Sequence, residues 1–226
     1  DAEDGHSLVL TVDQYIQQVT EKHLNDTLAE FKATNRGCAI VMDPKTCAIL
    51  AMATKGDYDL NNPFEISDPS VKEQVALLAD DEKSAARKAA LEKQWKNKTL
   101  EFYEPGSVFK TFTAAIAMEE GLVSENTQFY CGNAVTVADR TIRCWKSGGH
   151  GHQTLAQAIQ NSCNPAFISI GAKVGPTNFY QYFKNFGLTE KTGVDLNGEA
   201  SGIWFSKFQE VELATASFGQ NFKISM

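Results

Sequence analysis

The stretch Tyr-Glu-Pro-Gly-Ser-Val-Phe-Lys, residues 103–110, runs directly into an apolar segment. Pro105 and Gly106 break the preceding chain, and the apolar residues that follow recur at helical spacing, so the pattern predicts a helix that opens at Ser107. Lys110 lies one turn further on and falls on the same side as the hydroxyl of Ser107. A neighbouring base makes a serine nucleophilic, and burial gives a lysine amine the lowered pKa that this role needs.

A second motif strengthens this interpretation. Ser-x-x-Lys alone arises by chance about once in a chain of this length, and it also fits an N-cap serine beside an exposed lysine. However, Ser162 and Asn164 lie in a short link between a predicted helix over 154–160 and another that follows directly. Both polar side chains can point from this link into one cleft and position a lysine and a substrate amide. The motifs together predict a site made of Ser107, Lys110, Ser162 and Asn164.

These motifs resemble the transpeptidase domain of class B penicillin-binding proteins, especially the sporulation-specific type. The resemblance implies an α/β (α+β) fold of the penicillin-binding transpeptidase and serine β-lactamase type, with a helical subdomain and an antiparallel sheet. It also implies that Ser107 is acylated, that Lys110 is its base, and that Ser162 and Asn164 form the second active-site element. The segments that carry it cover nearly the whole chain: 10–13, 39–46, 49–53, 103–110, 149–151, 161–164 and 217–220.

The resemblance further implies a D,D-transpeptidase of cell-wall peptidoglycan synthesis that needs no cofactor for catalysis. Its substrates would be stem peptides ending in D-Ala-D-Ala, and β-lactams, which mimic this end, would be trapped on Ser107. Family members act at the extracytoplasmic face of the membrane, carry an upstream anchor helix and pedestal domain, and are expected to work with a membrane glycan polymerase. We therefore interpret residues 1–226 as the N-terminal and central part of one transpeptidase domain, whose remaining strands and closing helix follow Met226.

Other functions stay open at this stage. A β-lactamase or D,D-carboxypeptidase shares both motifs but needs a carboxylate base for deacylation, and Glu190 or Glu199 can fill that role. A non-enzymatic alternative is a β-lactam-sensing or zinc-stabilised interaction domain that is acylated but forms no cross-links. A thiol enzyme using Cys163 is disfavoured, because this side chain should point away from Ser162 and Asn164 and no histidine is placed to activate it.

Lys191-Thr192-Gly193 spells a third motif of serine acyltransferases, but its position is wrong. A predicted helix precedes it, and no alternating strand surrounds it, so we predict a non-catalytic loop. The resemblance places the true Lys-Thr-Gly on a strand beyond Met226, where it would form the oxyanion side of the cleft.

A second group of residues has the chemistry of a metal site. Cys131, Cys144, His150 and His152 lie in a glycine-rich segment, and structural zinc is held tetrahedrally by such sulfur and nitrogen ligands. The spacing is not that of a standard zinc finger, and Asp139 is a possible substitute ligand. The alternative is that the histidines serve loop geometry and the cysteines are packing residues. A bound zinc would be structural and would clamp the loop leading to the second motif.

Composition excludes several classes. The net charge of −7 argues against a nucleic-acid partner, and no apolar run reaches the length of a membrane span. The chain opens on polar residues, Asp1 to Gly5. Five cysteines leave one unpaired in any scheme, and in the predicted hairpin Cys38 and Cys47 are too far apart for a disulfide.

The rest of the chain predicts packing elements. Asp13 caps a helix that reaches about Phe31, and strands over 38–42 and 47–53 form a hairpin. Cys47 follows the turn, where a left-handed backbone would cost about 1 kcal/mol. A charged stretch over 69–96 predicts a solvated flap or a pair of short helices, with a partner surface as the alternative.

Overall fold

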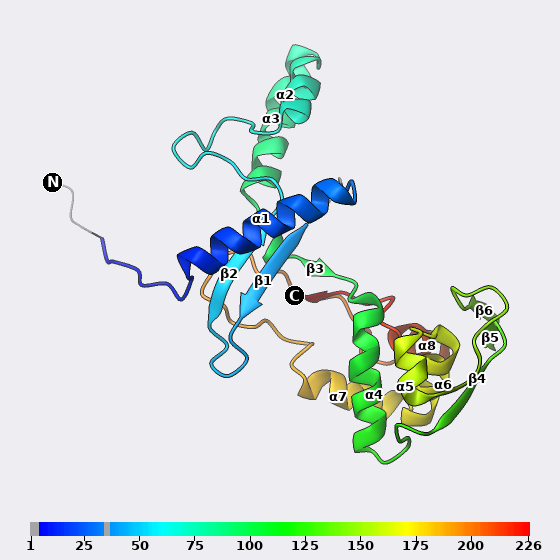
Figure 1. The fold of residues 1–226 in the computed structure, drawn as a ribbon. Helices are drawn as coiled ribbons and strands as arrows, with labels where there is room; N and C mark the ends of the chain where they lie inside the picture. Colours follow the sequence, from blue (N-terminus) through cyan, green and yellow to red (C-terminus); the bar gives the residue numbers. More distant parts are fainter. Residues whose placement is uncertain (1–4, 34–36) are drawn as a thin grey trace. The chain divides into compact units, whose positions relative to one another are not determined.

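A computed structural model describes residues 5–33 and 37–226 (Figure 1). The polar opening Asp1–Asp4 therefore lies outside the described residues. The described chain forms two compact units. The first extends to Glu101 and includes Met226, and the second comprises residues 102–225. The assignment of residues 1–226 to part of one domain stays a prediction.

A helix and a strand pair form the centre of the first unit. Helix α1 (Gln14–Glu30) begins after Asp13, whose carboxylate accepts a hydrogen bond from the backbone N–H of Ile16. Strand β1 (Cys38–Met42) pairs antiparallel with β2 (Ile49–Thr54). Helix α1 packs on this pair, and the side chain of Gln17 hydrogen-bonds both the N–H and the carbonyl of Met52. The predicted helix and hairpin are therefore confirmed.

Two details of the hairpin differ from the prediction. The second strand begins at Ile49 rather than at Cys47, because Cys47 adopts a left-handed backbone (φ 58°) within the turn. Cys38 pairs with Thr54, whereas the register expected from the sequence placed it opposite a residue near Ala51 or Met52.

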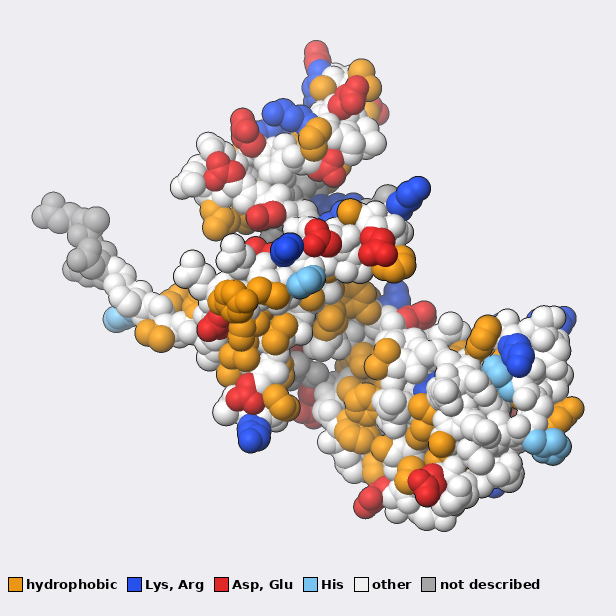
Figure 2. All heavy atoms as spheres, viewed as in Figure 1, with side chains coloured by type: hydrophobic (Ala, Val, Ile, Leu, Met, Phe, Trp, Pro, Cys, Tyr) orange, Lys and Arg blue, Asp and Glu red, His pale blue; other side chains and the backbone are white. Residues whose placement is uncertain are grey.

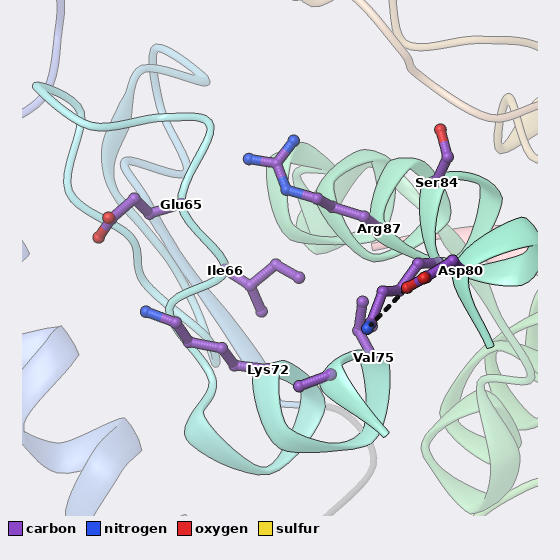
Figure 3. A pocket seen from close by; sticks show the side chains of 9 residues that line it. Glu65, Ile66, Lys72, Val75, Asp80, Ser84 and Arg87 are labelled. Atoms are coloured by element: carbon purple, nitrogen blue, oxygen red, sulfur yellow. Dashed lines mark hydrogen bonds and ion pairs between the residues drawn. The ribbon is translucent and has the colours of Figure 1, made fainter. Parts of the chain in front are cut away.

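The charged stretch, for which a solvated flap or a pair of short helices was predicted, forms two helices of 8 and 16 residues. Helix α2 (Pro69–Ala76) and α3 (Asp80–Trp95) are followed by the 3₁₀ turn η1 (Lys98–Leu100). Figure 3 shows the hollow between α2, α3 and the preceding loop, which none of the predicted site residues lines. Its charges are partly satisfied within the unit, because Lys83 pairs with Asp80 at 3.3 Å and Arg87 donates to the carbonyl of Phe64 at 2.7 Å.

The second unit is a helical core rich in phenylalanine. The 3₁₀ turn η2 (Gly106–Phe109) leads into α4 (Lys110–Glu119), and α4 and α8 (Glu210–Ala216) both pack against α6 (Asn164–Val174). Phe109 is buried in contact with the rings of Phe112, Phe179, Phe183 and Phe222. This packing fixes the turn that carries the first predicted motif. The helices of this unit are α4 (Lys110–Glu119), α5 (Leu155–Gln160), α6 (Asn164–Val174), α7 (Pro176–Asn185) and α8 (Glu210–Ala216).

Short strand pairs complete the second unit. They join β4 (Gln128–Cys131) to β7 (Gly151–Thr154), β5 (Ala134–Val137) to β6 (Arg140–Arg143), and β3 (Phe102–Tyr103) to β8 (Ile224–Ser225). The prediction of a glycine-rich loop is wrong for this region, because strands form in it that the sequence pattern did not indicate. Strands of two to four residues are too short to establish an alternating pattern.

Exposed hydrophobic side chains gather over the start of α1 and the β1–β2 pair in the first unit (Figure 2). Tyr15, Val19 and Met42 are among the exposed residues of this unit. Among the described helices, none combines the length and the apolar character needed to cross a bilayer.

Candidate active site

The two residues of the first motif differ in burial. Ser107 lies in η2 and is exposed, whereas Lys110 begins α4 and is only 2% exposed. The predicted helix therefore starts as a 3₁₀ turn, which Gly106 enters with a left-handed backbone (φ 60°). The N–H of Gly106 donates to the carbonyl of Gly219 at 2.8 Å. This bond ties the turn to the segment that follows α8.

Close packing supports the turn from the same segment. A Cβ atom on Gly219 would overlap the carbonyl oxygen of Gly106, so only glycine fits there. The hydroxyl of Thr113 on α4 donates to the carbonyl of buried Ser217 at 2.9 Å. The segment 217–220 thus supports η2 and α4 through backbone contacts.

The amine of Lys110 brings all four predicted site residues together. Its Nζ lies 2.9 Å from Ser107 Oγ, 2.8 Å from Ser162 Oγ and 2.8 Å from Asn164 Oδ1. The backbone carbonyl of Ser162 is 3.2 Å away. In its neutral form the amine has two N–H donors and one lone pair, so it can accept from one hydroxyl and donate to two of the remaining oxygens.

Burial favours that neutral amine. Desolvation lowers the pKa of Lys110 from 10.5 to about 8. The rings of Phe167 and Phe218 lie about 6 Å from Nζ, at 5.8 Å and 6.0 Å. Among the described residues, no carboxylate forms an ion pair with Lys110 to restore its charge. The amine therefore has the environment of a general base near neutral pH.

The second motif is a tight turn between two helices, as predicted. Helix α5 begins with a capping box between Thr154 and Gln157. After α5, the N–H of Ser162 donates to the carbonyl of Ile159 at 2.9 Å, and Ser162 has a left-handed backbone (φ 48°). Asn164 then begins α6. This reversal directs Ser162 and Asn164 to the same amine, although such a backbone costs a non-glycine residue about 1 kcal/mol.

Lys191-Thr192-Gly193 forms a loop, as predicted. The backbone N–H groups of Thr192 and Gly193 both donate to the carboxylate of Glu199, at 2.6 Å and 3.3 Å. The exposed Lys191 is not among the partners of Ser107 or Lys110. The Glu199 carboxylate is thus committed to its own loop, and its pKa is lowered chiefly by the N–H of Thr192.

The predicted metal ligands are brought together only in part. Cys131, Cys144 and His150 form a cluster with Cys163, and their ligand atoms all lie within 4.8 Å of one another. The three cysteines are buried and His150 is partly buried. Cys144 Sγ lies 3.4 Å from His150 Nδ1. These ligands come from the end of β4, the loop after β6, the residue before β7 and the link between α5 and α6.

His152 was predicted as a ligand, and the structure replaces it with Cys163. His150 precedes β7, and the left-handed backbone of Gly151 (φ 69°) separates it from the strand, in which His152 is exposed and packs its ring against Tyr130. Asp139 is also excluded, since it lies exposed at the turn between β5 and β6. One signal was available: the side chain of Cys163 was already predicted to point away from Ser162 and Asn164.

The donor set of the cluster suits zinc. Three thiols and an imidazole match structural Cys₃His sites, in which tetrahedral Zn–S bonds of about 2.3 Å place sulfurs about 3.8 Å apart. His150 Nε2 is buried without a hydrogen-bond partner among the described atoms. Burial, with the charge of Lys146, lowers the pKa of His150 and keeps the ring in the neutral form that binds metals. The three cysteines and His150 therefore fit a bound zinc ion.

Cys163 lies close to a histidine, contrary to the prediction. No histidine was expected near this thiol, yet His150 belongs to the same cluster. Cys163 is nevertheless fully buried, and burial raises the pKa of its thiol to about 12. A substrate therefore cannot reach this thiol, and without a metal the thiol does not ionise to the nucleophilic thiolate at neutral pH.

Comparison with known proteins identifies the family. A model described as "Penicillin binding protein transpeptidase domain" matches residues 37–226, so the chain belongs to the penicillin-binding protein transpeptidase family. Stage V sporulation protein D of Bacillus subtilis is 36% identical over 98% of this chain and 31% of that protein. Peptidoglycan D,D-transpeptidase MrdA of Escherichia coli is 28% identical over 88% of this chain and 29% of that protein. The chain thus spans less than a third of these relatives.

Solved structures give the same fold. The transpeptidase domain of Burkholderia pseudomallei penicillin-binding protein 3 is 22% identical, with a TM-score of 0.74 over 99% of this chain and 56% of that one. A peptidoglycan synthetase from Bifidobacterium adolescentis is 25% identical, with a TM-score of 0.75 over 96% of this chain and 35% of that one. The fold is the predicted α/β transpeptidase fold.

Proposed function

We propose that the protein carrying this chain is a serine D,D-transpeptidase that cross-links peptidoglycan stem peptides through an acyl-enzyme on Ser107. One observation carries the proposal: the buried amine of Lys110 lies within hydrogen-bond distance of Ser107, Ser162 and Asn164 together. A nucleophile, a base of lowered pKa and a second hydroxyl are the parts that acyl transfer at neutral pH requires. Membership of the transpeptidase family and the name of the relative MrdA support the substrate class.

The first step acylates the serine. The neutral amine of Lys110 takes the Ser107 proton across 2.9 Å, while Oγ attacks the carbonyl carbon between the two terminal D-alanines. The C–N bond then breaks, and the departing amine of D-alanine receives a proton from Lys110. Ser162 Oγ, 2.8 Å from Nζ, relays this proton. Asn164 Oδ1 accepts a hydrogen bond from the lysine and leaves its amide NH₂ group for the substrate.

The second step resolves the ester. An amine of another stem peptide attacks the acyl carbon and loses a proton to Lys110, and Ser107 leaves with a proton as the cross-link forms. We propose that this reaction takes place at the extracytoplasmic face of the membrane, in a protein anchored by a helix outside residues 1–226. A membrane glycan polymerase would supply the strands to be joined. Similarity to a sporulation protein supports a role in the spore wall.

Mass spectrometry of the full-length protein with benzylpenicillin tests the nucleophile. We expect one covalent adduct on Ser107 and none in Ser107→Ala. Ser169→Ala, a change on α6 outside the quartet, should retain the adduct. A protein that forms no adduct, or one whose adduct survives in Ser107→Ala, would remove the basis of the proposal.

The alternatives predict different fates for the acyl-enzyme. A β-lactamase or carboxypeptidase would hydrolyse it rapidly, but Glu199 is held by its own loop and Lys110 has no carboxylate partner among the described residues. We therefore expect an adduct that persists for hours. A sensing domain would also form a lasting adduct, so the assay must include a D-Ala-D-Ala stem peptide and an acceptor amine. A cross-linked product favours the transpeptidase, whereas acylation without product favours the sensor.

We further propose that Cys131, Cys144, His150 and Cys163 hold a structural zinc. The ion would supply a tetrahedral link between four chain segments, and the chemistry at Ser107 would not involve it. Protein prepared without chelator should contain about one zinc per chain. Cys144→Ser should lose it, whereas Cys47→Ser, a change at an exposed cysteine outside the cluster, should not. Zinc-free wild-type protein would refute this assignment and leave the serine site unaffected.

A further inference from the structure

Trp145 combines exposure with a specific polar contact. Its side chain is 68% exposed, yet its indole N–H donates a hydrogen bond to the backbone carbonyl of Asn161 at 2.9 Å. Its ring packs against the ring of His150 in a T-shaped arrangement, with ring centroids 5.4 Å apart. Trp145 thereby joins the loop before β7 to the residue that immediately precedes Ser162. No part of the mechanism above uses it.

The carbonyl that Trp145 holds belongs to the peptide group between Asn161 and Ser162. The orientation of this peptide plane determines φ of Ser162, which has the left-handed value of 48°. A serine gains nothing intrinsic from this conformation and relaxes from it unless its neighbours hold it. The side chain of Asn161 is held as well, because its amide donates to Gln153 at 3.1 Å. Residue 161 is thus fixed by its backbone and its side chain.

The conformation of Ser162 bears directly on the lysine. Both the hydroxyl and the backbone carbonyl of Ser162 contact Lys110 Nζ, at 2.8 Å and 3.2 Å. A rotation of the preceding peptide plane would move both oxygens relative to the amine. The position of Ser107 does not depend on this peptide plane, because its turn is held by the hydrogen bond from Gly106 to Gly219 in the segment after α8.

We propose that Trp145 is a positioning residue for acyl transfer. Its indole N–H holds the Asn161–Ser162 peptide in the orientation that places the Ser162 hydroxyl on Lys110. This inference rests on the proposed function, because it assigns Trp145 an effect on the proton relay. The ring itself needs no contact with substrate for this role.

Trp145→Phe is the sharpest test, since it keeps an aromatic ring but removes the N–H donor. In the full-length protein, the first-order rate constant of acylation by benzylpenicillin should fall about three- to tenfold, as expected for the loss of one hydrogen bond. The dissociation constant of the preceding non-covalent complex should stay the same. Trp95→Phe is the matched control, because it removes an indole N–H bond to the carbonyl of Pro63 in the first unit. It should leave the rate constant unchanged.

A double-mutant cycle separates positioning from general stabilisation. If Trp145 acts through Ser162, then Trp145→Phe should slow acylation in the wild-type background but have little further effect in Ser162→Ala. Equal effects in both backgrounds, or a wild-type rate constant in Trp145→Phe, would overturn the inference. These outcomes differ from failure of the proposed function, in which the wild-type protein itself forms no adduct on Ser107.

Discussion

The serine–lysine quartet and the cysteine–histidine cluster are two polar sites that share one short link. Along residues 162–164 the side chains alternate, so Ser162 and Asn164 reach Lys110 while Cys163 joins the cluster. The quartet is open, with an exposed nucleophile, and its amine has all its partners. The cluster is buried, and His150 Nε2 has no partner among the described atoms. The quartet therefore has the form of a reaction site, and the cluster that of a structural ligand site.

Removal of the base should have the largest effect, because it should abolish most of the acylation activity of the quartet and leave the cluster intact. Lys110→Met fits the apolar surroundings of Phe167 and Phe218 but supplies no base. We expect the rate of acylation by benzylpenicillin to fall about 10²- to 10⁴-fold, the usual contribution of general base catalysis. Zinc content should not change. Lys191→Met, in the loop that spells the misplaced third motif, is the control and should acylate at the wild-type rate.

The pH dependence of acylation should report on the same amine. Only neutral Lys110 accepts the serine proton, and its pKa lies at about 8. The rate should therefore rise about tenfold per pH unit below 8 and level off above it, giving a difference of roughly 90-fold between pH 6 and pH 9. Stopped-flow acylation across this range measures the profile. A flat profile, or one that levels off near pH 10, would show that burial does not prepare the base as proposed.

The quartet could be predicted from sequence because its motifs are local. Ser107 and Lys110 are one turn apart, and Ser162 and Asn164 flank a single residue. Only one long-range contact, between the two motifs, had to be inferred. Trp145 had no such motif, since its role depends on a backbone carbonyl that residue types do not reveal.

The cluster and the small strands were less predictable. The ligands come from four segments, and the strands beside them have only four residues, so the sequence could not show which of His150 and His152 points toward the cysteines. Cys163 was considered only as a nucleophile, and its burial emerged from the packing of α6. The hairpin of the first unit was predictable because longer strands flank a turn of clear chemistry.

Two neighbouring histidines provide a matched test of the cluster. His150→Ala should lose bound zinc, whereas His152→Ala should keep it, because His152 is exposed on the other side of β7. If zinc is present at about 100 times its dissociation constant, its loss removes about 2.7 kcal/mol of stability. This corresponds to a fall in Tm of about 5–11 °C. Metal analysis and thermal unfolding check both variants, and zinc loss in both would restore the ligand set predicted from sequence, which contains both histidines.

Alanine substitutions at two neighbouring glycines should have a smaller effect on stability, and they test how closely the cluster is packed. Gly148 and Gly149 both have left-handed backbones (φ 81° and 76°), so alanine at either position costs about 1 kcal/mol in strain. The positions differ in space: a Cβ on Gly148 meets no atom within 4 Å, whereas one on Gly149 would overlap the carbonyl oxygen of Cys131.

Gly149→Ala must therefore displace a backbone that carries a ligand, and Gly148→Ala need not. We expect Gly149→Ala to cost about 1–3 kcal/mol more than Gly148→Ala in denaturant unfolding, as for other cases of overpacking. Gly149→Ala should also weaken zinc binding. Because Cys163 connects the cluster to Ser162, the variant should slow acylation only if the cluster supports the quartet. An unchanged rate with lost zinc would mean that the hydrogen bonds of the link, including that of Trp145, are sufficient to hold Ser162 in place.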